Sequence, residues 1–181
     1  MVMLKNTEEK YGAVAKLFHW VIGITIIFML AFGLWMSDLP MSPDKFKYYG
    51  IHKSIGALVL IAAALRLLWR LTNKQPELPK DMPWYEKLGA NLSHIALYIM
   101  MFFMPLVGWA MSSAAGFPVT VFDAFTLPNL TSPSPEKVDL FKLLHYYGGL
   151  FMIGLISLHA LAALYHHFWH KDNVLKRMLP W

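Results

Sequence analysis

The stretch "LLHYYGGLFMIGLISLHALAALYHHFWH", residues 143–170, is a mainly apolar segment that carries five of the eight histidines in the chain. His145 lies near its start, His159 lies further along, and His166, His167 and His170 cluster at its end. A helix needs about 20 such residues to cross the lipid hydrocarbon. Because ionisable side chains are costly inside a membrane, these histidines are candidate functional residues.

The composition of the whole chain is that of a membrane protein. Of its 181 residues, 57% are hydrophobic and only 15% are charged, and the length suits one domain, residues 1–181. The net charge of +5 does not predict a nucleic-acid partner, because the basic residues lie at the ends of apolar runs. The chain has no cysteine, which excludes disulfides, thiolate metal sites, iron–sulfur clusters and covalently attached haem.

Four apolar segments are long enough to span a bilayer: residues about 17–36, 51–70, 88–112 and 143–168. Each must be helical, because lipid offers no partner to free backbone groups and the segments lack the alternating pattern of a β-barrel. The sequence therefore predicts an all-α fold, an integral membrane four-helix bundle. Pro105 lies inside the third segment, and Ser134 followed by Pro135 is typical of a helix start before the fourth.

The basic residues predict that both termini are cytoplasmic. An even number of spans puts the two termini on one side, together with these eleven basic residues: Lys5, Lys10, Lys16, Arg66, Arg70, Lys74, Lys80, Lys87, Lys171, Lys176 and Arg177. The other side has five: Lys45, Lys47, Lys53, Lys137 and Lys142. Since Lys and Arg are in excess on cytoplasmic loops, the first side is predicted to be the cytoplasmic one.

The spacing of the histidines predicts two levels in the bundle. From their positions in the sequence, His145 and His159 lie about 21 Å apart on nearly the same helix face. His52, at the outer start of the second segment, matches the depth of His145. His19, near the inner start of the first segment, matches the depth of His159.

Two facing imidazoles at each level are the arrangement that holds a haem iron from both sides in a helix bundle. Without cysteine the haem would be non-covalent, so two b haems are predicted, with the four histidines as iron ligands. Zinc is the alternative metal, but two histidines per level are too few for a closed tetrahedral site. A small residue follows each ligand by four positions and leaves room for a flat macrocycle: Gly23, Gly56, Gly149 and Ala163.

Three further residues are candidate cofactor contacts. His94, at the depth of His159, is a rival inner ligand, a partner of a quinone or propionate, or a structural histidine. Arg66 follows His52 at the interval that separates His145 from His159. It is a candidate partner for haem propionates or a quinone carbonyl, and the alternative is that its side chain extends toward the cytoplasmic interface. His166 lies nearly on the face of His159 and is a candidate ligand contact. His166 and His170 also have the i, i+4 spacing of a metal-ligand pair, with solvated interface histidines as the alternative.

Several motifs resemble the bacterial cytochrome b561 family of di-haem four-helix membrane proteins, over nearly the whole chain. They are "LFHW" at 17–20, "GIHKSIG" at 50–56, "RLLWR" at 66–70, "LSHIALY" at 92–98, "LLHYYGG" at 143–149 and "LHALAALYHHFWHKDNVLKRMLP" at 158–180. The resemblance implies the same pairs of haem ligands, His19 with His159 and His52 with His145.

The resemblance also implies a function and a location in the bacterial inner membrane. Within the family the motifs resemble superoxide oxidase, which implies that electrons pass from periplasmic superoxide to ubiquinone near the cytoplasmic side. The alternative is an electron-transfer subunit that anchors a hydrogenase or another soluble dehydrogenase. Lys45, Lys47, Lys53 and Lys142 form either a cationic rim that steers superoxide or a set of ordinary surface lysines.

Overall fold

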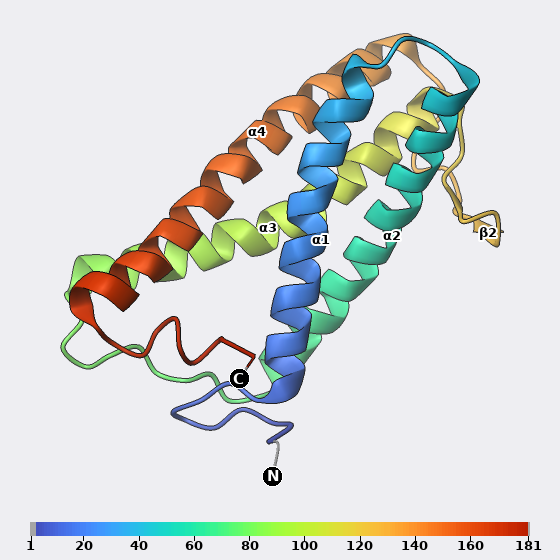
Figure 1. Cartoon of the computed structure of the whole chain (residues 1–181). Helices are drawn as coiled ribbons and strands as arrows, with labels where there is room; N and C mark the ends of the chain where they lie inside the picture. The colour runs from blue at the N-terminus through green and yellow to red at the C-terminus, as the bar shows by residue number, and fades with distance from the viewer. Residues whose placement is uncertain (1–2, 181) are drawn as a thin grey trace.

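The computed structural model describes residues 3–180 and consists mainly of four long helices (Figure 1). They are α1 (Ala13–Asp38), α2 (Pro43–Thr72), α3 (Trp84–Ala114) and α4 (Pro135–Tyr165), and a π-helical turn, η1 (His166–His170), continues α4. All four helices are long and apolar enough to cross a membrane. The all-α, four-helix membrane architecture predicted from the sequence is therefore confirmed.

The helices run alternately up and down, and each packs mainly against its neighbour in sequence, whereas α1 and α4 have few contacts. Both termini lie at the same end of the bundle, together with the connection between α2 and α3 (Figure 1). At that end Trp20 Nε1 donates a hydrogen bond to the Met178 carbonyl at 2.8 Å, and the Glu77 amide donates to the Glu8 carbonyl at 3.2 Å. The N-terminal segment, the α2–α3 connection and the C-terminal tail therefore close this end together.

The buried core lies midway between the two predicted histidine levels. It consists of Ile22, Ile26, Val59, Ala63, Met100, Met101 and Met152. Met152 lies halfway along α4 between His145 and His159, so an apolar layer separates the two levels. Outward-facing residues such as Ile24 and Leu161 are each 62% exposed, as expected for helix faces that contact lipid.

The opposite end of the bundle carries a short hairpin in the α3–α4 connection, β1 (Thr120–Val121) and β2 (Phe125–Thr126). Its turn places Phe122 and Asp123 at positive φ, 45° and 58°. Ser54 of α2 holds the hairpin, because its hydroxyl accepts from the Phe122 amide at 3.0 Å. The predicted helix start is confirmed next to this connection, where Ser134 caps α4 and Pro135 is its first residue.

Lys45 has a structural role that the sequence did not reveal. Its side chain is buried, and its ammonium donates hydrogen bonds to the carbonyls of Ser37 and Leu39 at the end of α1. These carbonyls have no partner within their own helix, and a cation near a helix C-terminus is favourable. For Lys45 both alternatives from the sequence, a cationic rim and an ordinary surface lysine, are therefore wrong, because this buried lysine joins α1 to α2.

We expect Lys45→Met to lower the free energy of unfolding by roughly 1–3 kcal/mol, because it leaves the two carbonyls at the end of α1 without their donor. The measurement is equilibrium unfolding in detergent micelles. Lys47→Met is the matched control, since Lys47 forms an exposed ion pair with Asp44 and its loss should cost under about 1 kcal/mol. Equal losses in the two variants would contradict the capping role of Lys45.

Candidate cofactor-binding site

The outer level brings together two predicted ligands from different helices. The rings of His52 (α2) and His145 (α4) have centres 6.1 Å apart, with their planes at 78°. The Nδ1 atoms of both histidines are buried and have no hydrogen-bond partner within residues 3–180. Buried polar atoms without partners are uncommon, so the pair has the character of a binding site rather than of ordinary packing.

The inner level brings together three histidines. The ring of His159 (α4) lies 6.1 Å from that of His19 (α1) and 5.4 Å from that of His94 (α3), centre to centre. Two imidazoles on opposite sides of one metal ion have ring centres about 6 Å apart, given metal–nitrogen bonds of about 2.0–2.1 Å. The His19–His159 separation therefore fits a shared metal and equals that of the outer pair, whereas the His94–His159 separation is shorter.

Arg66 of α2 completes the inner level. Its Nη2 lies 3.2 Å from Nδ1 of His19, and its Nε donates to the hydroxyl of Tyr98 at 3.2 Å. Because a guanidinium can only donate, Nδ1 of His19 accepts in this contact. Arg66 therefore points into the bundle at this level, and the sequence alternative in which it extends to the interface does not describe its contacts.

The backbones of two glycines lie close to the outer pair of rings, and the sequence analysis did not identify either glycine. A Cβ at Gly33 of α1 would lie 3.3 Å from Cε1 of His52, and one at Gly108 of α3 would lie 3.1 Å from Cε1 of His145. Both distances are shorter than the usual carbon–carbon contact of about 3.5–4.0 Å. Glycine thus lets the backbones of α1 and α3 approach the imidazoles from either side.

A repeated spacing in the sequence could have revealed these glycines. Gly33 follows His19, and Gly108 follows His94, at the same interval that separates His145 from His159. Arg66 follows His52 at this interval as well. Each helix thus presents one residue of this set at each of the two levels.

The small residues that follow the predicted ligands have different surroundings. A Cβ at Gly23 would meet no described atom of a neighbouring side chain within 4 Å, so the space beside His19 is open. A Cβ at Gly56 would lie 4.0 Å from Cε of Met29, and one at Gly149 would lie 3.8 Å from Cε of Met104. The space next to the small residue is therefore open beside His19, whereas beside the outer histidines it is lined by flexible methionine side chains.

His166, the remaining predicted contact, lies in η1 and has its own partners. Its Nδ1 lies 2.6 Å from Oδ2 of Asp172, and its Nε2 lies 3.8 Å from Oε2 of Glu86. These partners come from the tail and from the first turn of α3. The described contacts therefore associate His166 with carboxylates at the end of the bundle rather than with Arg66 and His94.

Comparison with known proteins places the chain in a family. Residues 10–181 match the family model of prokaryotic cytochrome b561. Cytochrome b561 homolog 2 of Escherichia coli (strain K12) is 36% identical over 176 residues, which cover 96% of this chain and 93% of that protein. Cytochrome b561 homolog 1 of the same strain is 33% identical over 129 residues, or 71% of this chain and 73% of that protein.

A further relative has a name that describes an activity. The probable superoxide oxidase CybB of Yersinia pestis is 28% identical over 174 residues, which cover 96% of this chain and 97% of that protein. The predicted family resemblance is confirmed by the family model and by the more similar relatives. The chain therefore belongs to the prokaryotic cytochrome b561 family, as a multi-pass bacterial membrane protein of electron transfer, and the family implies b-type haem.

Proposed function

We propose that the protein is a di-haem b-type cytochrome that takes electrons from superoxide at one membrane face and delivers them to ubiquinone near the other. The observation that carries the proposal is the presence of two histidine pairs with the same ring separation, 6.1 Å, at two levels of one bundle. Two cofactor sites stacked across the membrane form a path for electrons. The name of the Yersinia pestis relative supports superoxide as the donor.

His52 and His145 would hold the outer haem, and His19 and His159 the inner one. When bound, haem would supply one-electron redox chemistry, and the two histidines of each pair would be its protein ligands. The chain would therefore bind and orient the groups, and the apolar core around Met152 would exclude water between the levels.

We further propose that the end with both termini faces the cytoplasm, in the bacterial inner membrane. The excess of Lys and Arg at this end supports that orientation, eleven against five. The hairpin and the α1–α2 turn would then face the periplasm, close to the outer histidine pair. Superoxide would be oxidised at the hairpin end, and quinone would be reduced at the end with the termini.

Lys53 is the residue best placed to attract superoxide at the outer face. It follows His52 directly, and its ammonium donates to Ser112 Oγ at 3.2 Å and to the Pro118 carbonyl at 3.1 Å. Neither partner is charged, and no carboxylate forms an ion pair with Lys53 within residues 3–180. Its positive charge is therefore not neutralised locally and would raise the capture rate of a small anion.

Arg66 and His94 would contact the quinone or a haem propionate at the inner level. A histidine that binds a metal through Nε2 keeps its proton on Nδ1 and cannot accept a hydrogen bond there. Arg66 would then leave His19 and donate to another acceptor, such as a carboxylate or a quinone carbonyl. His166 was predicted for the same role, but its contacts with carboxylates favour a separate role at the end of the bundle.

The electron balance requires two superoxide anions for each quinone. Two anions leave as two O2 molecules, and the quinone takes up two electrons and two protons from the cytoplasmic side. No side chain has to act as a nucleophile in this scheme. The protein residues bind the groups, attract the anion and donate hydrogen bonds to the quinone.

A superoxide pulse tests the proposal. Purified, oxidised protein is mixed with superoxide and a water-soluble ubiquinone analogue while the haem α-band is followed. We expect rapid growth of the band and its decay as quinol forms, and superoxide dismutase should abolish both. A band that dithionite reduces but superoxide does not would overturn the superoxide step and favour a partner dehydrogenase as donor.

A further inference from the structure

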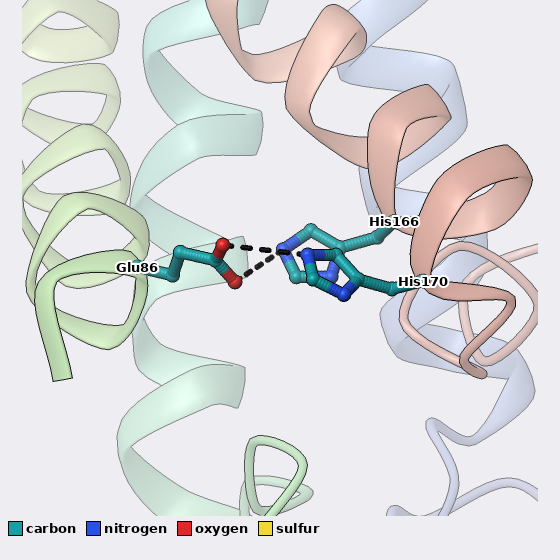
Figure 2. Close-up of side chains that lie close together, drawn as sticks. All are labelled: Glu86, His166 and His170. Carbon is teal, nitrogen blue, oxygen red and sulfur yellow. Dashed lines mark ion pairs between the residues drawn. The ribbon is translucent and has the colours of Figure 1, made fainter. Parts of the chain in front are cut away.

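Three side chains at the end of the bundle that holds both termini point toward one another: Glu86, His166 and His170 (Figure 2). One ligand atom from each lies within 4.8 Å of the other two. Oε1 of Glu86 is 3.3 Å from Nε2 of His170, and Oε2 is 3.8 Å from Nε2 of His166. The carboxylate comes from the first turn of α3 and the imidazoles from η1, so the cluster joins elements that are distant in sequence.

The local backbone explains how the two imidazoles come to lie side by side. Residues 166–170 form a π-helical turn, and the rings of His166 and His170 have centres 5.1 Å apart with planes tilted by 30°. Lys171 then adopts a left-handed conformation, φ 56°, which ends the helix. π-Helical turns and left-handed non-glycine residues are rare in proteins as a whole, but they are enriched at functional sites.

The reversal at Lys171 brings Asp172 back onto the ring of His166. Oδ2 of Asp172 lies 2.6 Å from Nδ1 of His166, on the side of the ring opposite Glu86. Metal-binding histidines commonly donate their other ring N–H to a carboxylate, which fixes the orientation of the ring and raises its basicity. Asp172 is therefore a positioning residue that leaves Nε2 of His166 free to bind a ligand.

The distances and donors fit a transition-metal ion. In tetrahedral geometry with bonds of about 2.0–2.2 Å, neighbouring ligand atoms are separated by about 3.3–3.5 Å. The distance from Oε1 of Glu86 to Nε2 of His170 is in this range, and that from Oε2 to Nε2 of His166 is slightly longer. The side chains of Glu86 and His166 are 18% and 12% exposed and that of His170 is 34% exposed, so solvent reaches the cluster from one side. Oε2 of Glu86 is buried and has no hydrogen-bond partner among residues 3–180.

We propose that Glu86, His166 and His170 bind one divalent transition-metal ion, such as zinc. Two imidazoles and one carboxylate suit such ions, and three protein ligands leave a fourth position for water. The site is distinct from the two histidine levels, since His166 lies about 10 Å beyond His159 along the helix. A bound ion would join the start of α3 to the end of α4.

Zinc binding to the purified haem-loaded protein tests the site. The protein is prepared without a polyhistidine tag, treated with a chelator and dialysed against increasing ZnCl2, and zinc and haem are measured per chain. We expect one zinc per chain with micromolar affinity, and X-ray absorption at the zinc edge should show two imidazoles. Failure of the wild-type protein to bind zinc below millimolar concentration would overturn the proposal, whatever its haem content.

Variants separate the site from non-specific binding. Glu86→Gln and His170→Asn should each weaken zinc binding at least tenfold, and Asp172→Asn by about 10–100-fold. His167→Asn is the matched control, because His167 is an imidazole of the same turn outside the cluster, and it should bind zinc like the wild type. Retained haem absorption checks folding. Unchanged affinity in both Glu86→Gln and His170→Asn would mean that the cluster is only a network of ion pairs.

Discussion

Replacing His145 with alanine is expected to lower the haem content from two to one per chain. The ring of His145 is one of the two imidazoles at the outer level, 6.1 Å from that of His52. A b haem would have no covalent bond to the chain, so removing one of its two protein ligands would weaken its retention. Haem per chain is measured from the pyridine haemochrome, and the remaining α-band should be that of the inner site alone.

A substitution on the neighbouring helix α3 should also remove one haem, although it leaves both predicted ligands in place. A Cβ at Gly108 already lies 3.1 Å from Cε1 of His145, so Gly108→Leu must displace the ring. Gly154→Leu is the matched control, because a Cβ there meets no described neighbour within 4 Å and the residue is exposed. Two haems per chain in His145→Ala would refute the outer pairing, and two in Gly108→Leu would refute the steric role of this glycine.

At the inner level, His19→Ala is expected to remove one haem, whereas His94→Ala should keep both. The ring of His159 lies 6.1 Å from that of His19, which suits a shared metal, but only 5.4 Å from that of His94. Each of the two variants removes one imidazole, and the two imidazoles lie at the same depth on different helices. Haem per chain and the low-spin signals in electron paramagnetic resonance distinguish the two ligand sets.

His167→Ala is the control for the inner level, because it removes an imidazole from η1 without touching either pair. It should keep both haems and their spectra. If His94→Ala loses a haem while His19→Ala retains two, His94 is the partner of His159 and the proposed pairing of His19 with His159 is wrong. Loss of quinone reduction in His94→Ala with both haems retained would support its role as a quinone contact.

The sequence by itself determined the architecture. Four apolar segments without alternative backbone partners can only become helices in lipid, and their lengths match the bilayer. The helical period also put His145 and His159 on one face, two levels apart. Local rules sufficed for these features, including the capped start at Ser134 and Pro135, because each depends on residues within a few turns of one another.

Tertiary structure decided which residues from different helices meet. Such contacts depend on how each helix is rotated and how deep it lies in the bundle. Examples are the contacts of Gly33 with His52, of Lys45 with the end of α1, and of Arg66 with His19. No pattern within a single helix carries that information. The period of one helix tells which of its faces turns inward, but not which side chain of a neighbour lies opposite.

The cluster at the end of the bundle illustrates this difference. The i, i+4 spacing of His166 and His170 is visible in the sequence, but a pair of histidines alone is weak evidence for a metal site. Glu86 is distant from His166 in the chain and meets it only because α3 and α4 pack antiparallel. The sequence supplied two donors by local spacing, and the packing of two helices supplied the third.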